Sequence, residues 1–433
     1  MAERCNHTIH KHHLGWNNAN EPVLSIASGE TIEFRTIDSS GQQITPSSTV
    51  ADIAKLDFGK VNPVSGPIFV EDAEPGDAIK VTLLDFTPSG WGWTANIPGF
   101  GLLADQFKEP ALHIWKYDPA SLKPAAYGPG GRVPLKPFCG TIGLAPAEPG
   151  THSIVPPRRV GGNMDIRDMS VGTQLYLPVE VAGGLFSVGD THAAQGDGEV
   201  CGTAIESQMN VAAKFELVKG ANIAFPRYRI PGHASLHRDA KGMAPAAYGP
   251  GGRVPLRPFC GTIGLAPAEP GTHSIVPPRR VGGNMDIRDM AAGTELHLPV
   301  EVKGALFSVG DTHAAQGDGE VCGTAIESQM NLVARFELLK DANLGFPRYR
   351  TPGPVSRHND AKGYDVTTGI GPDLMRGARD AVSGMIDLLG KRHGLSAVDA
   401  YLLCSVAGDL RISEIVDMPN WVVSFYFPRI VFE

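Results

Sequence analysis

Residues 173–181 read TQLYLPVEV, and residues 294–302 read TELHLPVEV. The two stretches differ at Gln174 and Tyr176, which are Glu and His in the second stretch, while Leu175 and Leu177 are unchanged. Side chains of a strand alternate between its two faces, so variation on one face and apolar constancy on the other predict a strand with one solvated side. AKFELVKG at 213–220 and ARFELLKD at 334–341 predict strands by the same rule.

These stretches belong to a long internal repeat. Residues 124–242 align without gaps to residues 245–363, at a constant shift of 121 residues, and FSVGDTHAAQGDGEVCGTAIESQMN occurs identically at 186–210 and 307–331. Solenoid repeats run about 20 to 50 residues and stack in arrays, so one copied unit of this size indicates a segmental duplication instead. The stretch RDAKGMAPAAYG at 238–249 reads as the seam.

The single-copy flanks differ in character. ETIEFRTI and DAIKVTLLDF near the N-terminus alternate apolar and polar residues and predict strands. Near the C-terminus, Asp373 precedes a run of apolar residues at helical spacing that ends near Gly394, Ser396 and Asp399 resemble a capping box for a second helix, and LRISEIVD and WVVSFYF predict closing strands. The fold class is α+β with much β, divided into residues 1–123, a first block at 124–243, a second block at 244–363, and residues 364–433.

Composition narrows the class of protein. The chain of 433 residues is 42% hydrophobic, and its formal charge of -8 is spread along the sequence without a basic stripe, so nothing favours nucleic acid. The N-terminus lacks the apolar core of a secretory signal, and no apolar run approaches the roughly 18 residues of a membrane helix. We expect a soluble, unexported protein with reduced cysteines and a small ligand.

The repeated GDTHAAQGDGE holds the candidate chemistry. Asp190 and His192 lie two residues apart, so on a strand both side chains share a face and can reach one ion, and Asp165 follows the glycine pair of GGNMD upstream. Carboxylate and imidazole ligands without thiolate suit zinc, manganese, iron or calcium. The second block repeats these positions as Asp286, Asp311 and His313. The competing interpretation is that acids beside glycines only cap turns.

A carboxylate near such an ion can carry a proton to the leaving nitrogen of an amide, and Glu199 is the first choice for that role. Its counterpart is Glu320. Cys139 and Cys201 have no neighbouring histidine and are interpreted as core residues. His13 is the one N-terminal histidine placed to approach the site, and Trp91 and Trp93 could line a pocket or fill the core.

The whole set of motifs resembles the acetamidase/formamidase family. The matching stretches follow the family's order, with the middle ones present twice: HLGW at 13–16, NPVSGPIFVEDAEPGDAIKV at 62–81, WGWTANIPGFGLLADQF at 91–107, PFCGTIGLAPAEPG, GGNMD, GDTHAAQGDGEVCGTAIE, and TTGIGPDLM at 367–375.

The resemblance implies a metal-dependent enzyme that hydrolyses a short aliphatic amide, such as formamide or acetamide, to a carboxylate and ammonia. It implies a β-sandwich-like body with a smaller α+β C-terminal region, a cytoplasmic location and a homo-oligomer. Carried over by motif, Asp165, Asp190 and His192 look like the ligands of a divalent metal, with zinc first and calcium second. Glu199 looks like the acid/base, although Asp197 or Glu206 could exchange roles with it.

The duplication leaves two middle blocks for one pair of flanks. Our hypothesis at this stage is that the second block completes the body with residues 1–123, because it runs without a seam into KGYDVTTGIGPDLM, and that the first block is an extra lobe. A chain-exchanged oligomer is an alternative. Two further alternatives are a metal-stabilised β protein that binds a ligand without turnover, and a chain that exposes strand edges and folds poorly.

Overall fold

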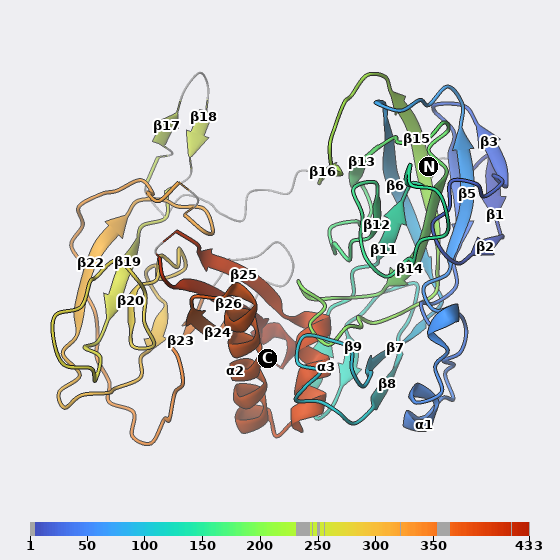
Figure 1. Ribbon diagram of the computed structural model, residues 1–433. Helices are drawn as coiled ribbons and strands as arrows, with labels where there is room; N and C mark the ends of the chain where they lie inside the picture. The colour runs from blue at the N-terminus through green and yellow to red at the C-terminus, as the bar shows by residue number, and fades with distance from the viewer. Residues whose placement is uncertain are drawn as a thin grey trace. The chain divides into compact units, whose positions relative to one another are not determined.

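A computed structural model describes residues 5–230, 243–244, 246–248, 252–254, 256–320, 322–352, 364–416 and 418–432. The chain forms two compact units, Met1–Gly232 and His233–Glu433, which we call unit 1 and unit 2 (Figure 1). Unit 1 holds the N-terminal region with the first block, and unit 2 holds the second block with the C-terminal region. Most of the predicted seam lies outside the described residues.

Two six-stranded sheets form the body of unit 1 (Figure 1). The first has the order β1-β4-β15-β6-β13-β16, with bounds His7–Ile9, Thr31–Arg35, Met209–Val218, Ala78–Pro88, Gln174–Pro178 and Arg227–Arg229. The second has the order β12-β11-β14-β5-β2, with β3 beside β5, and bounds Gly161–Asn163, Phe138–Gly143, Phe186–His192, Val64–Val70, His12–His13 and, for β3, Leu24–Ile26. Pairing is antiparallel except for β1 with β4 and β3 with β5.

The two sheets pack face to face through three phenylalanine rings. Phe34 of β4 and Phe215 of β15 meet Phe186 of the other sheet, with ring centroids 5.5 and 4.9 Å from that of Phe186. All three side chains are fully buried. Removing a Phe side chain from water contributes about 1.5–3 kcal/mol, so this cluster is a main source of stability for unit 1. The β-rich, sandwich-like body predicted from the sequence is confirmed.

Two hairpins and two short helices complete unit 1. Their bounds are β7 Trp91–Asn96 with β8 Ala111–Lys116, β9 Ala125–Tyr127 with β10 Gly131–Val133, α1 Val50–Ile53, and the 3-10 helix η1 Phe58–Lys60. Trp93 lies in a small core with Ile44 and Ile53, and Trp91 packs against it. The core interpretation of these tryptophans is therefore the correct one.

Unit 2 contains two larger sheets and a hairpin. The sheet β20-β19-β22 comprises Gly282–Asn284, Phe259–Gly264 and Ser308–His313. The sheet β21-β23-β24-β26-β25 comprises Glu295–His297, Arg348–Thr351, Tyr364–Gly371, Trp421–Pro428 and Asp409–Glu414. The hairpin joins β17 Ala246–Tyr248 to β18 Gly252–Val254, and the 3-10 helix η3 Arg429–Val431 follows β26.

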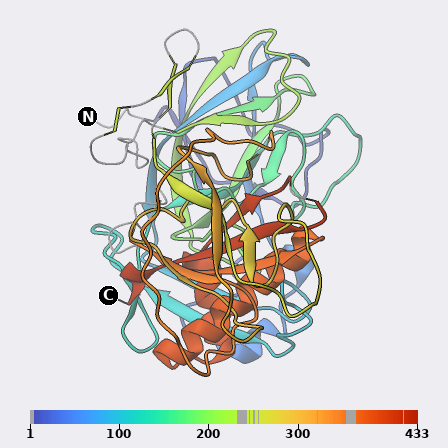
Figure 2. The same ribbon diagram turned by 90° about the vertical axis from the view of Figure 1, so that its left-hand side faces the viewer.

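The C-terminal helices agree with their predicted signals. Helix α2 spans Leu374–His393, with the Asp373 carboxylate accepting from the Arg376 amide at 2.7 Å and with Gly394 ending the helix at a φ of 68°. Helix α3 spans Ala397–Ala407, and the Ser396 hydroxyl accepts from the Asp399 amide at 3.2 Å. Helix α2 packs on β24 and β26, as Figures 1 and 2 show. None of the described helices is long and apolar enough to span a membrane.

The hypothesis about the blocks is wrong. Strand β15 of the first block lies between the N-terminal strands β4 and β6, and β14 of the first block pairs with N-terminal β5. In unit 2, β23 of the second block pairs with C-terminal β24. The first block therefore has the N-terminal frame, and the second block has the C-terminal one.

The strand predicted at 334–341 is also wrong. In the first block this sequence is part of β15, where both edges of the strand are hydrogen-bonded to neighbours. In the second block no strand is formed over the described residues 331–339, and Phe336 is 66% exposed, whereas its counterpart Phe215 is buried. A pattern that suits a pleated, half-buried surface needs that surface, and β4 and β6 pair with the first block.

Candidate active site

The candidate residues of unit 1 gather where β14 ends. Asp190 and His192 are among the last three residues of that strand, Asp165 follows β12, and Glu199 and Glu206 lie on the segment after β14. Two groups of mutually close side chains share the imidazole: Asp165, His192 and Glu199 form one, and Asp190, His192 and Glu206 form the other, with all donor atoms of a group within 4.8 Å. The structure thus brings together all four residues predicted for the first block, and adds Glu206.

Three of the carboxylates lie on left-handed backbone. The φ angles are 49° at Asp165, 48° at Asp190 and 41° at Glu199. The counterparts in the second block have φ of 45°, 50° and 44°. Such conformations of non-glycine residues cost on the order of 1 kcal/mol or more each and concentrate at functional sites. The repeat of this geometry in both blocks shows that the local sequence encodes it.

The imidazole of His192 is fixed on both nitrogens. The Gln195 amide donates to the Asp165 carbonyl oxygen at 2.8 Å, which turns its own oxygen toward the ring, 2.9 Å from Nδ1. Nδ1 therefore carries a hydrogen, and Nε2 faces Asp190 Oδ1 and Glu206 Oε2, each at 3.1 Å. The Phe138 ring meets the imidazole edge to face at 5.0 Å.

Positive charge is favoured at Nε2. Burial alone would lower the pKa of His192, but the Glu206 and Asp190 carboxylates outweigh it and raise that pKa well above its usual range. Burial alone would raise the pKa of Asp190, but the imidazole charge and hydrogen bonds lower it. Two buried carboxylates facing one nitrogen need a cation between them, either a proton or a metal ion.

On the other side of the ring, the pKa values of the carboxyl groups of Asp165 and Glu199 are raised. Burial, and next the charge of Asp165, raise the pKa of Glu199 well above its usual range. Burial, and next the charge of Asp190, raise the pKa of Asp165 to about 7. Asp165 and Glu199 are half-buried as residues. Burial and neighbouring negative charge thus favour the protonated form of both carboxyl groups.

The N-terminal region supplies supports that sequence reasoning missed. The Ser39 hydroxyl donates to Glu206 Oε2 at 2.7 Å, and the Asn62 amide donates to Asp190 Oδ2 at 3.3 Å. Asn62 opens the NPVSG motif, which could have indicated it. Nothing in the sequence around Ser39 indicated its contact, because Ser39 and Glu206 are far apart in the chain.

Other candidates lie outside the two groups. Asp197 forms an ion pair with Arg167 at 3.1 Å. His13 reaches the Ser187 hydroxyl at 2.8 Å, and burial lowers its pKa. Cys139 is fully buried and burial raises its pKa, so its thiol is no nucleophile near neutral pH, and Cys201 is buried as well. All six cysteines are free thiols.

The second block repeats the contacts of the imidazole, but its outer carboxylates are more exposed to solvent. His313 lies 2.9 Å from Gln316 Oε1 and 3.1 Å from both Asp311 and Glu327. The side chains of Asp311 and Glu327 are 38% and 48% exposed, compared with 5% and 3% for Asp190 and Glu206. Asp286, His313 and Glu320 form the other group and are buried. The second cluster has the geometry, but its outer carboxylates stand in solvent, where charges are screened.

A glycine beside the cluster gives a direct test of which block matters. A Cβ at Gly140 would lie 2.5 Å from Asp165 Oδ1 and 2.8 Å from His192 Cε1, and a Cβ at Gly261 would crowd Asp286 and His313 in the same way. We expect Gly140→Ala to lower activity about 10- to 100-fold by displacing these groups, and Gly261→Ala to leave activity nearly unchanged. Steady-state rates of the two variants compare the blocks. Equal losses would contradict the preference for unit 1.

Comparison with known proteins identifies the family. The model of the Acetamidase/Formamidase family matches residues 2–154, 147–238 and 265–433. The chain belongs to this family. It is 25% identical over 443 residues to a candidate formamidase of Schizosaccharomyces pombe, covering 97% of this chain and 90% of that protein. It is 28% identical to a formamidase of Methylophilus methylotrophus, over 48% of this chain and 64% of that protein.

An acetamidase of Mycolicibacterium smegmatis is 28% identical over 48% of this chain and 66% of that protein. For the two bacterial relatives, the match therefore spans less than two thirds of the relative's own length. Among solved structures, a gamma lactamase from Delftia acidovorans superposes with a TM-score of 0.63 at 21% identity, covering 99% of this chain and 93% of that one. This similarity shows the fold of the acetamidase/formamidase chain and supports its β-rich architecture.

Proposed function

We propose that the protein hydrolyses a short aliphatic amide, of the formamide or acetamide type, at the cluster of unit 1. The family membership supports amide hydrolysis, and two relatives bear the names formamidase and acetamidase. The observation that carries the proposal is the His192 imidazole between two groups of carboxylates: one group raises the pKa of the imidazole, and in the other the pKa of Glu199 is itself raised.

The residues of the cluster fit a divalent cation. Asp165 Oδ1 is buried and accepts no hydrogen bond, so it offers a lone pair with no other use. The 3.1 Å separations between His192 Nε2 and the two carboxylate oxygens are close to the roughly 3.3 Å between donors on one tetrahedral zinc ion. A cation at Nε2 would be held by Asp190, His192 and Glu206, while the predicted ligand Asp165 belongs to the other group, with His192 and Glu199.

Mixed imidazole and carboxylate donors favour zinc, and calcium, which prefers six to eight oxygen ligands, is the second choice. When bound, the cation would supply Lewis-acid activation of the amide carbonyl and of a water molecule. Glu199, whose pKa is raised by burial and next by the charge of Asp165, would deliver a proton from its carboxyl oxygen to the leaving nitrogen. Gln195 and Phe138 would hold the imidazole in place, and Ser39 and Asn62 would hold two of the carboxylates.

Two measurements on one purified sample test the proposal. Elemental mass spectrometry gives the metal content per chain, and ammonia release from formamide and acetamide gives activity. We expect bound metal with activity, loss of both on chelation, and recovery on adding zinc. Activity that persists in a metal-free sample would contradict the metal. A folded, metal-loaded protein that releases no ammonia from either amide would contradict amide hydrolysis and favour a non-catalytic, metal-stabilised protein.

A further inference from the structure

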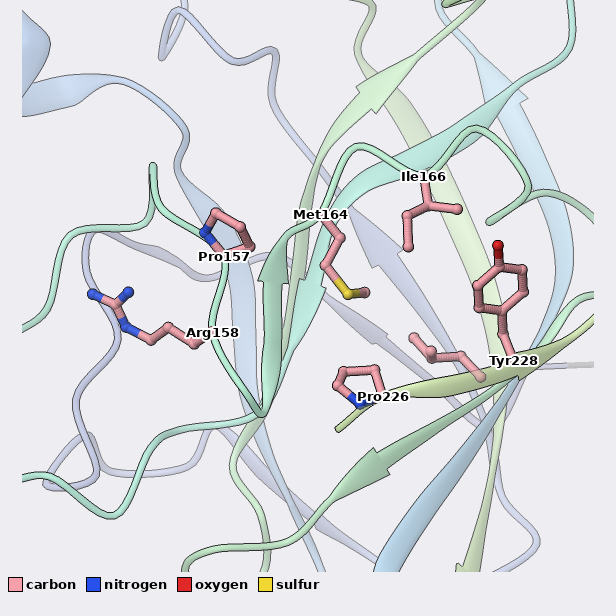
Figure 3. A pocket seen from close by; sticks show the side chains of 7 residues that line it. Pro157, Arg158, Met164, Ile166, Pro226 and Tyr228 are labelled. Carbon is pink, nitrogen blue, oxygen red and sulfur yellow. The ribbon is translucent and has the colours of Figure 1, made fainter. Parts of the chain in front are cut away.

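Unit 1 has an apolar cleft of about 320 Å³ next to the cluster (Figure 3). Its lining includes Met164 and Ile166, which flank Asp165, and also Leu175, Pro226 and Tyr228. Figure 3 shows the Met164 thioether, Pro226, Ile166 and the Tyr228 ring around one hollow, with Arg158 at its other end. Tyr228 is 42% exposed.

Unit 2 shows what covers the same residues in the second block. The counterparts Met285, Ile287 and Tyr349 are buried in a core, and Leu296 packs against it. Their partners come from the C-terminal strands: Tyr364, Val366 and Ile370 of β24, and Tyr426 of β26. Tyr349 is only 2% exposed, and its hydroxyl donates to that of Tyr426 at 2.6 Å.

The strand edge beside the cleft repeats this contrast. In unit 2, β23 pairs with β24, with Tyr349 opposite Val366 and Arg350 opposite Asp365. Among the residues of unit 1 that the structure describes, the counterpart β16 is the last strand of its sheet, and its three residues are exposed. An open edge beside an apolar hollow is the arrangement that binds an added strand, because the backbone supplies hydrogen bonds and the hollow selects side chains.

The arginines of β23 and β16 show the same contrast between the two units. In unit 2, Arg348 pairs with Asp387 of α2 at 2.9 Å, and Arg350 pairs with Asp365 of β24 at 3.1 Å. Their counterparts on β16, Arg227 and Arg229, are exposed cations. The carboxylates that would match them lie in the C-terminal region. The apolar cleft, the edge of β16 and the two arginines of β16 therefore all match the C-terminal region.

We propose that this face of unit 1, formed by β16 and the cleft, binds the C-terminal region, residues 364–432, of a second copy of this chain. In this exchange, β24 of the second copy would leave its own β23 and pair with β16 instead, and Tyr364, Val366 and Tyr426 would fill the cleft. The cleft residues Met164, Ile166, Leu175, Pro226 and Tyr228 are identical at the corresponding positions of the second block, where the structure shows this docking.

The exchange also completes the site. In unit 2, the Gly319 amide donates to the Ser413 carbonyl oxygen at 3.0 Å, and Asp289 lies 2.9 Å from the Tyr426 hydroxyl. The counterparts are Gly198, next to Glu199, and Asp168. A docked C-terminal region would thus fasten the loop that carries Glu199.

A mixing experiment tests the exchange. One batch carries Arg229→Cys and a second batch, with a different tag, carries Asp365→Cys. Register partners on adjacent antiparallel strands lie about 4.5–5.5 Å apart at Cα, which suits a disulfide. We expect mild oxidation of the mixture to give a covalent heterodimer on a non-reducing gel. Lys55→Cys, at an exposed site remote from β16 in sequence, replaces Arg229→Cys in the control and should give none, because Asp365 is buried in unit 2.

Three results would overturn the proposal. The first is no heterodimer above the Lys55→Cys control, while the double variant Arg350→Cys/Asp365→Cys closes its own disulfide and so shows that the chemistry works. The second is a cross-link of Arg229→Cys/Asp365→Cys found only within monomers. The third is a monomer mass for the unmodified protein by light scattering over a hundredfold range of concentration. Conversely, Tyr228→Asp should abolish a dimer without unfolding unit 1, since Tyr228 is exposed.

Discussion

Replacement of His192 by alanine should reduce ammonia release from formamide about 10²- to 10⁴-fold, the range typical of losing a positioned catalytic group. The imidazole belongs to both groups of carboxylates, so its removal leaves Asp190 and Glu206 facing each other in a buried site with no cation between them. Two carboxylates this close in a buried site cannot both stay ionised. Loss of the imidazole would also weaken binding of a metal ion. Initial rates and metal content of the purified variant measure both effects.

His313→Ala is the matched control, because the second imidazole makes the same contacts at the same distances. We expect nearly unchanged activity, since the outer carboxylates of that cluster are exposed and lack the Ser39 and Asn62 supports. Circular dichroism should show both variants folded. Loss of activity in His313→Ala with full activity in His192→Ala would place the reaction in the second block.

Phe215→Ala should destabilise unit 1 by about 3–5 kcal/mol, the usual cost of removing a fully buried phenylalanine. Its ring contacts Phe34 and Phe186 between the two sheets, so alanine leaves a cavity where the sheets meet. Four of the five tryptophans lie in unit 1, at positions 16, 91, 93 and 115, so tryptophan fluorescence during urea unfolding follows this unit.

Phe336→Ala changes the corresponding residue of the second block and should alter stability by less than about 0.5 kcal/mol. Its ring is largely exposed and meets Phe307 at 4.8 Å. A large destabilisation by Phe336→Ala would mean that the segment 331–339 packs against something in solution. Equal effects of the two variants would refute the assignment of the N-terminal strands to the first block.

Local sequence patterns predicted much of the fold. The alternation in ETIEFRTI and DAIKVTLLDF predicted β4 and β6, and the capping residues Asp373 and Gly394 fixed both ends of α2. The failure at 334–341 has a physical cause. Nearly the same letters form a central strand in one place and no strand in the other, because strand formation depends on neighbouring strands that lie far away in sequence.

The candidate site was predictable to a similar extent. Spacing of two residues placed Asp190 and His192 together, and the motif identified Asp165 and Glu199. Spacing could not separate Glu199 from Asp197, since the separation depends on a left-handed backbone and an ion pair with Arg167. Glu206 reaches the imidazole because its backbone bridges to Trp93 and His192, which are long-range contacts that no local pattern records.

The matching backbone of the two clusters has a consequence for protein engineering. The register of Phe138 opposite His192 recurs as Phe259 opposite His313, and the left-handed carboxylates recur with it, although different strands surround the two blocks. The backbone geometry of the cluster is therefore encoded within each block, whereas the burial of its outer carboxylates depends on the strands that surround the block. To transfer the cluster to another protein, a designer would have to bury it and to place a hydroxyl and an amide where Ser39 and Asn62 donate to the outer carboxylates.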